Sequence, residues 1–145
     1  MWWRTFFTAS LAIASTAAAA APWARISATE AGDVYWVDIG SMTEEGGVRR
    51  AWAKAEYAKP FASGVAAGAV EALALSAYNC RTRQKALLKV TYYGRRGEVI
   101  RTAQWDYPSW DHVTPGTVSE SHLNFACSYP IGTDPRQIEG LQVRN

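Results

Sequence analysis

The chain has 145 residues, of which 48% are hydrophobic and 19% are charged. This length accommodates one domain of ordinary size, and the composition excludes a disordered or solvating chain. The formal net charge is only +2, so any attraction to acidic partners must come from the distribution of charge.

Residues 1–20 predict a cleaved signal peptide. Arg4 is the one positive charge of a short first segment, and an apolar stretch leads into an alanine run from Ala17 to Ala21. Small residues of this kind are what signal peptidase accepts. We expect cleavage after Ala20, because a cut after Ala21 would make Pro22 the first residue of the mature protein. A transmembrane anchor is the weaker alternative, since a span needs ~20 apolar residues. We therefore expect an exported protein with no transmembrane segment after cleavage.

Cys80 and Cys127 are the two cysteines, and pairing is the default for an exported chain. Two separately buried thiols are the alternative. A disulfide would close a loop of about 48 residues and contribute on the order of 4 kcal/mol in the chain-entropy model. The count and spacing exclude a CxxC redox centre and a cysteine-rich zinc site. No cysteine lies near the cleavage site, which argues against a lipid anchor.

Alternating or β-branched patterns predict several strands, and the turn Gly94–Gly97 predicts that the last two form a hairpin. The segment Glu71–Asn79 fits both a helix and a strand, so its residues alone leave the choice open. The predicted strands cover residues 23–28, 34–39, 48–57, 86–93 and 98–105.

Near the C-terminus, Thr117 and Glu120 match a capping box and predict a helix that ends at about Ser128. Leu123 and Cys127 lie one turn apart on it. Burial of that face against the sheet would bring Cys127 to Cys80. Residues 130–145 show little periodicity and predict a loose tail.

The chain resembles the bacterial surface-adhesin protein E family from about Tyr35 to Cys127. The segments that carry the resemblance are, in order, Tyr35-Trp36-Val37-Asp38, Glu56-Tyr57-Ala58-Lys59-Pro60, Tyr78-Asn79-Cys80-Arg81, Tyr92-Tyr93, and Pro115-Gly116-Thr117-Val118 before the helix that ends at Cys127.

The resemblance implies an α+β fold, with a curved antiparallel sheet of about six strands and a C-terminal helix tied to it by a Cys80–Cys127 disulfide. It implies that residues 71–80 form a strand and that residues 21–129 form an adhesin-E-like domain. The family's namesake lies on the bacterial surface, lipid-anchored, and adheres to host matrix proteins. Since this chain lacks a lipobox cysteine, we expect a periplasmic or secreted protein, with cell-surface display as a further option.

A basic segment around the predicted hairpin is the first candidate binding site. Arg83, Lys85 and Lys89 are separated by even numbers of residues, so a continuous strand would place their side chains on one face. Such a patch could attract acidic proteins, acidic glycans or anionic lipids. The alternative is a solvated face that guards against aggregation. The resemblance matches this region with the namesake's adhesive stretch. The seven residues are Arg81, Arg83, Lys85, Lys89, Arg95, Arg96 and Arg101.

An aromatic loop with Trp105, Tyr107 and Trp110 is the second candidate. Exposed aromatic rings beside carboxylates suit sugar or peptide binding. The alternative is that the two tryptophans fold over the rim of the core.

No pattern predicts an enzyme. His112 follows Asp111, and His122 lies in the predicted helix, but no nucleophile elbow, metal-spaced histidine pair or phosphate loop is present. We expect no catalytic residues, no cofactor and no metal. Nucleic-acid binding fits poorly with export and the lack of a recognisable module.

The sequence therefore predicts an adhesin-like module that binds acidic protein or glycan partners through the basic segment. The alternative is an envelope structural or assembly protein without a small ligand, which forms homodimers through a sheet edge.

Overall fold

The computed structural model describes residues 22–144, so the predicted signal peptide lies outside the described residues. The fold is one antiparallel sheet with one α-helix, α1 (Val118–Ser128), and two short 3-10 turns. The strands are β1 (Trp23–Ala28), β2 (Val34–Asp38), β3 (Thr43–Glu45), β4 (Val48–Glu56), β5 (Glu71–Asn79), β6 (Gln84–Tyr93), β7 (Val99–Gln104), β8 (Asp111–His112) and β9 (Val143–Arg144).

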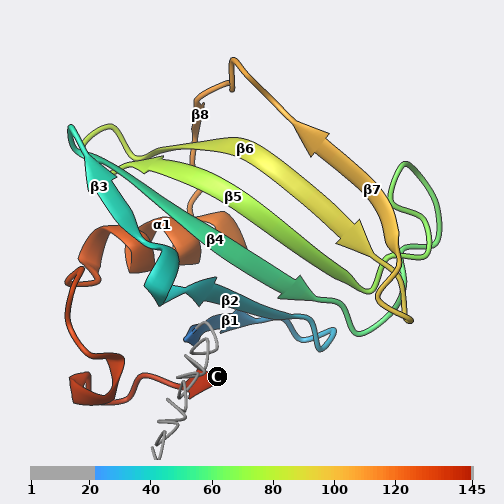
Figure 1. Cartoon of the computed structure of the whole chain (residues 1–145), viewed down its shortest axis with the longest axis horizontal. Helices are drawn as coiled ribbons and strands as arrows, with labels where there is room; N and C mark the ends of the chain where they lie inside the picture. The colour runs from blue at the N-terminus through green and yellow to red at the C-terminus, as the bar shows by residue number, and fades with distance from the viewer. Residues whose placement is uncertain (1–21, 145) are drawn as a thin grey trace, which may run out of the picture.

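Figure 1 shows a curved sheet whose main path runs β7-β6-β5-β4-β2-β1-β9, with β3 added to β4 and β8 added to β6. The antiparallel sheet, the C-terminal helix and the disulfide are confirmed. The predicted number of about six strands is wrong, because the sheet has nine. The additional strands β3, β8 and β9 have two or three residues each, too few for any periodicity in the sequence.

Strands β4 and β5 bury one face more deeply than the other, because side chains alternate along a strand. We call the face that packs against α1 the inner face. Its core includes Val37, Ala53 and Tyr78, which meet Leu123 and Ala126 of α1. Small residues on the strands let the helix approach closely. This core holds α1 against β1, β4, β5 and β6.

The opposite, outer face carries tryptophans beside charged residues. The ammonium group of Lys54 lies 5.1 Å from the ring centroid of Trp23 and 5.8 Å from that of Trp36. The Trp36 indole also donates to Glu56 at 3.1 Å, and Lys54 pairs with the same carboxylate at 3.0 Å. The outer tryptophans thus belong to a network of cation–π and polar contacts.

Helix α1 begins where the capping box predicts. The Thr117 hydroxyl accepts from the Glu120 amide at 3.3 Å, while the Glu120 carboxylate accepts from the amide of Gly116 at 2.8 Å. At the other end, the Cys80–Cys127 disulfide joins α1 to the end of β5, with 5.6 Å between the Cα atoms. The helix is therefore fixed by a cap at one end and a covalent bond at the other.

The C-terminal segment differs from the predicted loose tail. After α1 the chain turns back, and β9 pairs with β1 through Trp23–Arg144 and Ala24–Val143. Ile138 and Leu141 pack against the core beside Val143. These apolar residues are spaced irregularly, so they produce no strand or helix pattern.

Candidate functional site

The basic residues of the β5–β6–β7 segment do not form one face. Lys85 pairs with Tyr78 and so points to the inner face, whereas Lys89 pairs with Leu75 and points to the outer face. The cause is a β-bulge, because the register passes from Lys89 to Leu87 and skips Leu88. The prediction that Arg83, Lys85 and Lys89 share a face is therefore wrong.

Arg83 lies in the turn before β6, with φ of 54°. Its guanidinium donates to the Glu120 carboxylate at 3.2 Å and to the side-chain oxygen of Asn124 at 3.0 Å. These contacts join the turn to α1. Arg83 is thus engaged in holding the helix, in addition to any binding role.

The remaining basic residues of the segment form no ion pair within residues 22–144. Arg81 is exposed in the same turn as Arg83. Arg95 and Arg96 are exposed in the turn between β6 and β7, at the other end of the hairpin. Arg101 is exposed on β7 and pairs with Tyr92. The hairpin therefore carries free positive charge at both ends rather than in one patch.

The aromatic loop is exposed, which differs from the alternative that its tryptophans cover the core. Tyr107 is 97% exposed, Trp105 is 42% exposed and Trp110 is 39% exposed. Trp105 and Tyr107 line a shallow cavity of about 270 Å³ together with Leu87 and Asp111. The rings are thus available to a partner.

A half-open cavity lies between α1 and the inner face, and the sequence analysis missed it. Its volume is about 300 Å³. We call it the alanine-floored cavity, because small side chains of adjacent strands leave the space open. These floor residues are Ala53, Ala55, Ala72 and Ala74.

Aromatic side chains form one side of the alanine-floored cavity. Tyr35, Tyr57 and Tyr92 all line it. Burial raises the pKa of Tyr57 to about 12, with smaller contributions from Tyr92 and Tyr35. Burial also raises the pKa of Tyr35, so these two phenols are neutral. None of the three phenols forms a hydrogen bond within residues 22–144. Phe61 supports them, with its ring centroid 4.5 Å from that of Tyr57.

His122 and Lys85 also line the cavity, and the His122 ring meets that of Tyr35 edge to face, with 6.1 Å between the centroids. His122 is 5% exposed, and its Nδ1 lies 2.9 Å from the carbonyl oxygen of Val118. A carbonyl only accepts, so Nδ1 carries the proton and Nε2 presents a lone pair. Burial, followed by the nearby Lys85 charge, lowers the pKa of His122 to about 4. The imidazole is therefore neutral at physiological pH.

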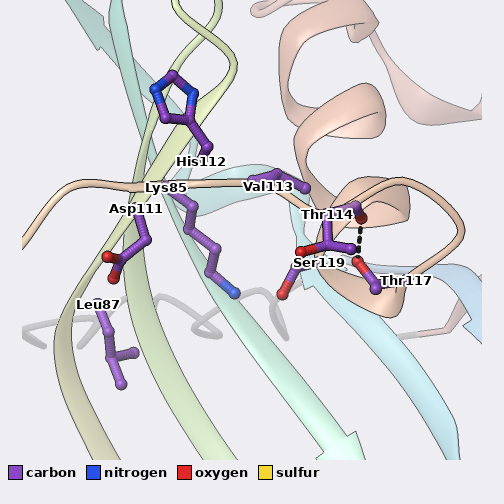
Figure 2. Close-up of a pocket in the computed structure, with 8 residues that line it drawn as sticks. All are labelled: Lys85, Leu87, Asp111, His112, Val113, Thr114, Thr117 and Ser119. Atoms are coloured by element: carbon purple, nitrogen blue, oxygen red, sulfur yellow. Dashed lines mark hydrogen bonds between the residues drawn. The ribbon is translucent and has the colours of Figure 1, made fainter.

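A second cavity of about 330 Å³ adjoins the first, and the two share Lys85, Leu87 and Ser119. Figure 2 shows the Lys85 side chain and the Ser119 hydroxyl pointing into the space between β6 and the start of α1. Asp111 and His112 also line this cavity, and the His112 ring points away from Lys85 and Ser119. Burial lowers the pKa of Lys85, and its ammonium group lies 5.9 Å from the ring centroid of Tyr78.

The histidines of the described residues belong to no metal-binding group. Within residues 22–144 no group of three or more His, Cys, Asp or Glu side chains could hold a metal ion. His122 bonds to a backbone carbonyl rather than to a serine hydroxyl. In the same range, no helix is both long and apolar enough to cross a membrane.

A family model described as surface-adhesin protein E matches residues 23–128. Among solved structures, crystal form II of Haemophilus influenzae protein E is similar with a TM-score of 0.51 and 14% identity, covering 83% of this chain and 96% of that one. Another structure of Haemophilus influenzae protein E has a TM-score of 0.51 and 14% identity, covering 81% and 90%. No curated protein matches the sequence. The structural likeness concerns the fold.

Proposed function

The chain belongs to the surface-adhesin protein E family, and from this premise we propose that it is an exported adhesin domain that binds acidic protein or glycan partners through its basic hairpin. The observation that supports this function is the free charge of the hairpin. Of its seven basic residues, Arg83 alone is paired with a carboxylate within residues 22–144.

Unpaired exposed cations attract polyanions, and the attraction weakens as salt screens it. Arg95, Arg96 and Arg101 are the best placed, because they are exposed and gather near the β6–β7 turn. Glu98 is the one opposing carboxylate in that turn, and its oxygen accepts from the backbone amide of Arg96 at 2.9 Å. The aromatic loop would add ring contacts to a sugar or peptide.

The test is binding of the oxidised protein to immobilised sulfated glycan and to matrix proteins, with Arg95→Glu/Arg96→Glu as the variant. The proposal expects the variant to lose most of the low-salt binding. The matched control is Arg50→Glu/Lys59→Glu, which makes the same charge change at two exposed positions outside the hairpin. Equal loss in both variants would mean that only total charge matters and would overturn the assignment to the hairpin.

The alternative function, a self-associating envelope protein, is favoured by the exposed strand β7. This strand ends the main path of the sheet, and Val99 at its start is 59% exposed. An unpaired edge can add a strand from another chain. Sedimentation over a range of protein concentrations distinguishes the two functions, because self-association through backbone pairing would survive the Arg95→Glu/Arg96→Glu change.

A further inference from the structure

The alanine-floored cavity combines an apolar floor with polar sides. The sides carry three phenols, one hydroxyl, one imidazole and the Lys85 ammonium group. The atoms of these groups that have no protein partner are open to the cavity, since the buried side-chain atoms without a partner in residues 22–144 belong to Ser76 and Tyr78. A polar ligand of matching shape can replace the water that reaches these groups and form several hydrogen bonds at once.

Lys85 offers its charge to an anion. Its half-buried side chain lies on the inner face between β6 and α1, and it forms no ion pair within residues 22–144. Asp111 pairs with Lys85 in the β6–β8 register, yet its carboxylate makes no ion pair with the ammonium. The ammonium lies 5.9 Å from the ring centroid of Tyr78, and this cation–π contact leaves its N–H donors free for an anionic ligand. The start of α1 adds partial positive charge at Val118 and Ser119, which also line the cavity.

His122 offers an acceptor to the cavity. Nδ1 is bonded to the Val118 carbonyl, so Nε2 is an acceptor on a ring that is 5% exposed and lines the cavity. No hydrogen bond reaches Nε2 from residues 22–144. The phenols of Tyr35, Tyr57 and Tyr92 can both donate and accept. A ligand that carries several hydroxyl or N–H groups besides a negative charge can therefore pair with all of these groups.

The shape of the cavity favours a ring over a chain. Tyrosine rings on one side and alanine methyl groups below provide flat apolar surfaces, and a volume of about 300 Å³ is at the lower end for small-molecule sites. A fatty acid would leave the hydroxyls and Nε2 without partners. A planar aromatic acid would satisfy Lys85 but few of the remaining groups.

We propose that the alanine-floored cavity binds one carboxylate-bearing sugar unit, with its carboxylate at Lys85 and the first turn of α1, its hydroxyls at His122 Nε2 and the phenols, and its ring against the tyrosines. This inference deepens the proposed function, on which it rests, because it names the sugar unit that an acidic glycan partner would present. It assigns recognition to the cavity and long-range attraction to the hairpin arginines.

The test is an NMR titration of the oxidised protein with free glucuronic acid and with free N-acetylneuraminic acid, in which the amide chemical shifts are monitored. Glucose is the neutral probe. At least one of the two acids should shift amides of β5, β6 and the start of α1, and glucose should not. Lys85→Met keeps the apolar stem and should weaken binding about ten-fold or more. Ala55→Leu fills the floor of the cavity and should abolish binding of the sugar acid. This second variant keeps the test decisive if Lys85→Met folds poorly.

Arg95→Glu/Arg96→Glu is the control that separates this inference from the proposed function. It should lose binding to the sulfated polymer and keep the affinity for the acidic monosaccharide. Polymer binding without any monosaccharide shift would overturn the inference and leave the proposed function standing. Equal binding of glucose, or stronger binding of octanoate or benzoate than of either sugar acid, would also overturn it.

Discussion

Arg49 holds the C-terminal end of α1 by donating from one guanidinium nitrogen to the carbonyl oxygens of Ala126 and Tyr129, both at 2.7 Å. The last carbonyls of a helix have no partner within the helix, and a cation there also interacts favourably with the helix dipole. Glu44 accepts from Arg49 Nε at 2.8 Å and orients the side chain. The strand β4 thereby fixes the end of the helix that carries Cys127.

Arg49→Met should lower the free energy of unfolding by about 2–3 kcal/mol, because it removes charge-assisted hydrogen bonds to half-buried carbonyls. Chemical denaturation measures the change. The control is Arg50→Met, since Arg50 is exposed on the other face of the same strand and should cost no more than about 0.5 kcal/mol. Similar losses in the two variants would contradict the role of Arg49.

Reduction of the Cys80–Cys127 disulfide should lower the free energy of unfolding by about 4 kcal/mol. The bond joins residues 47 apart in sequence, and it restricts the unfolded chain accordingly. Denaturation with and without reductant gives the value, and a Cys80→Ala/Cys127→Ala variant should not respond to reductant. An unchanged midpoint on reduction would show that packing alone holds α1.

Tyr78→Phe should leave stability unchanged or raise it by about 1 kcal/mol. The Tyr78 side chain is fully buried, and its hydroxyl forms no hydrogen bond of good geometry, with the equally buried Ser76 hydroxyl beside it as a weak partner. Removal of the Tyr78 hydroxyl therefore relieves a desolvation cost that is larger than the contact it loses. Tyr129→Phe is the matched control, because its hydroxyl donates to the Thr133 carbonyl at 3.0 Å and its loss should cost about 1 kcal/mol. A larger loss for Tyr78→Phe than for Tyr129→Phe would refute this account.

Stability should fall as the pH is lowered from about 6.5 to about 4, because of His122. Its pKa is about 4 in the folded protein, against an ordinary value of 6.5. Between these pH values the unfolded chain binds the proton more readily than the folded protein, so acid favours unfolding. The free energy of unfolding should fall by about 3 kcal/mol over the whole range. Denaturation at a series of pH values tests this, with His122→Gln expected to flatten the dependence and His112→Gln, at an exposed position, expected to keep it.

Much of the fold was predictable because its long elements carry clear local patterns. The strands from Val48 and Ala86 alternate over many residues, and Thr117 and Glu120 mark the start of α1. The segment Glu71–Asn79 had no decisive pattern of its own, because leucine and alanine suit both a helix and a strand. Its strand state comes from pairing on both sides, with β4 and β6.

The candidate site was predictable only in part. The basic composition around the hairpin is visible in the sequence, but the bulge at Leu88 is not, and it moves Lys89 to the face opposite Lys85. The alanine-floored cavity gives no sequence signal, since alanines on adjacent strands become a floor only once the register is known. The same holds for His122, whose role depends on which cavity its helix covers.

Binding of the oxidised protein to an array of acidic glycans and matrix proteins, at low and at high salt, tests the central claim most directly. The account predicts binding above background at low salt that decreases as salt screens the hairpin arginines. Absence of binding to every acidic partner at low salt would contradict an adhesin function, and binding that does not change with salt would contradict its electrostatic basis.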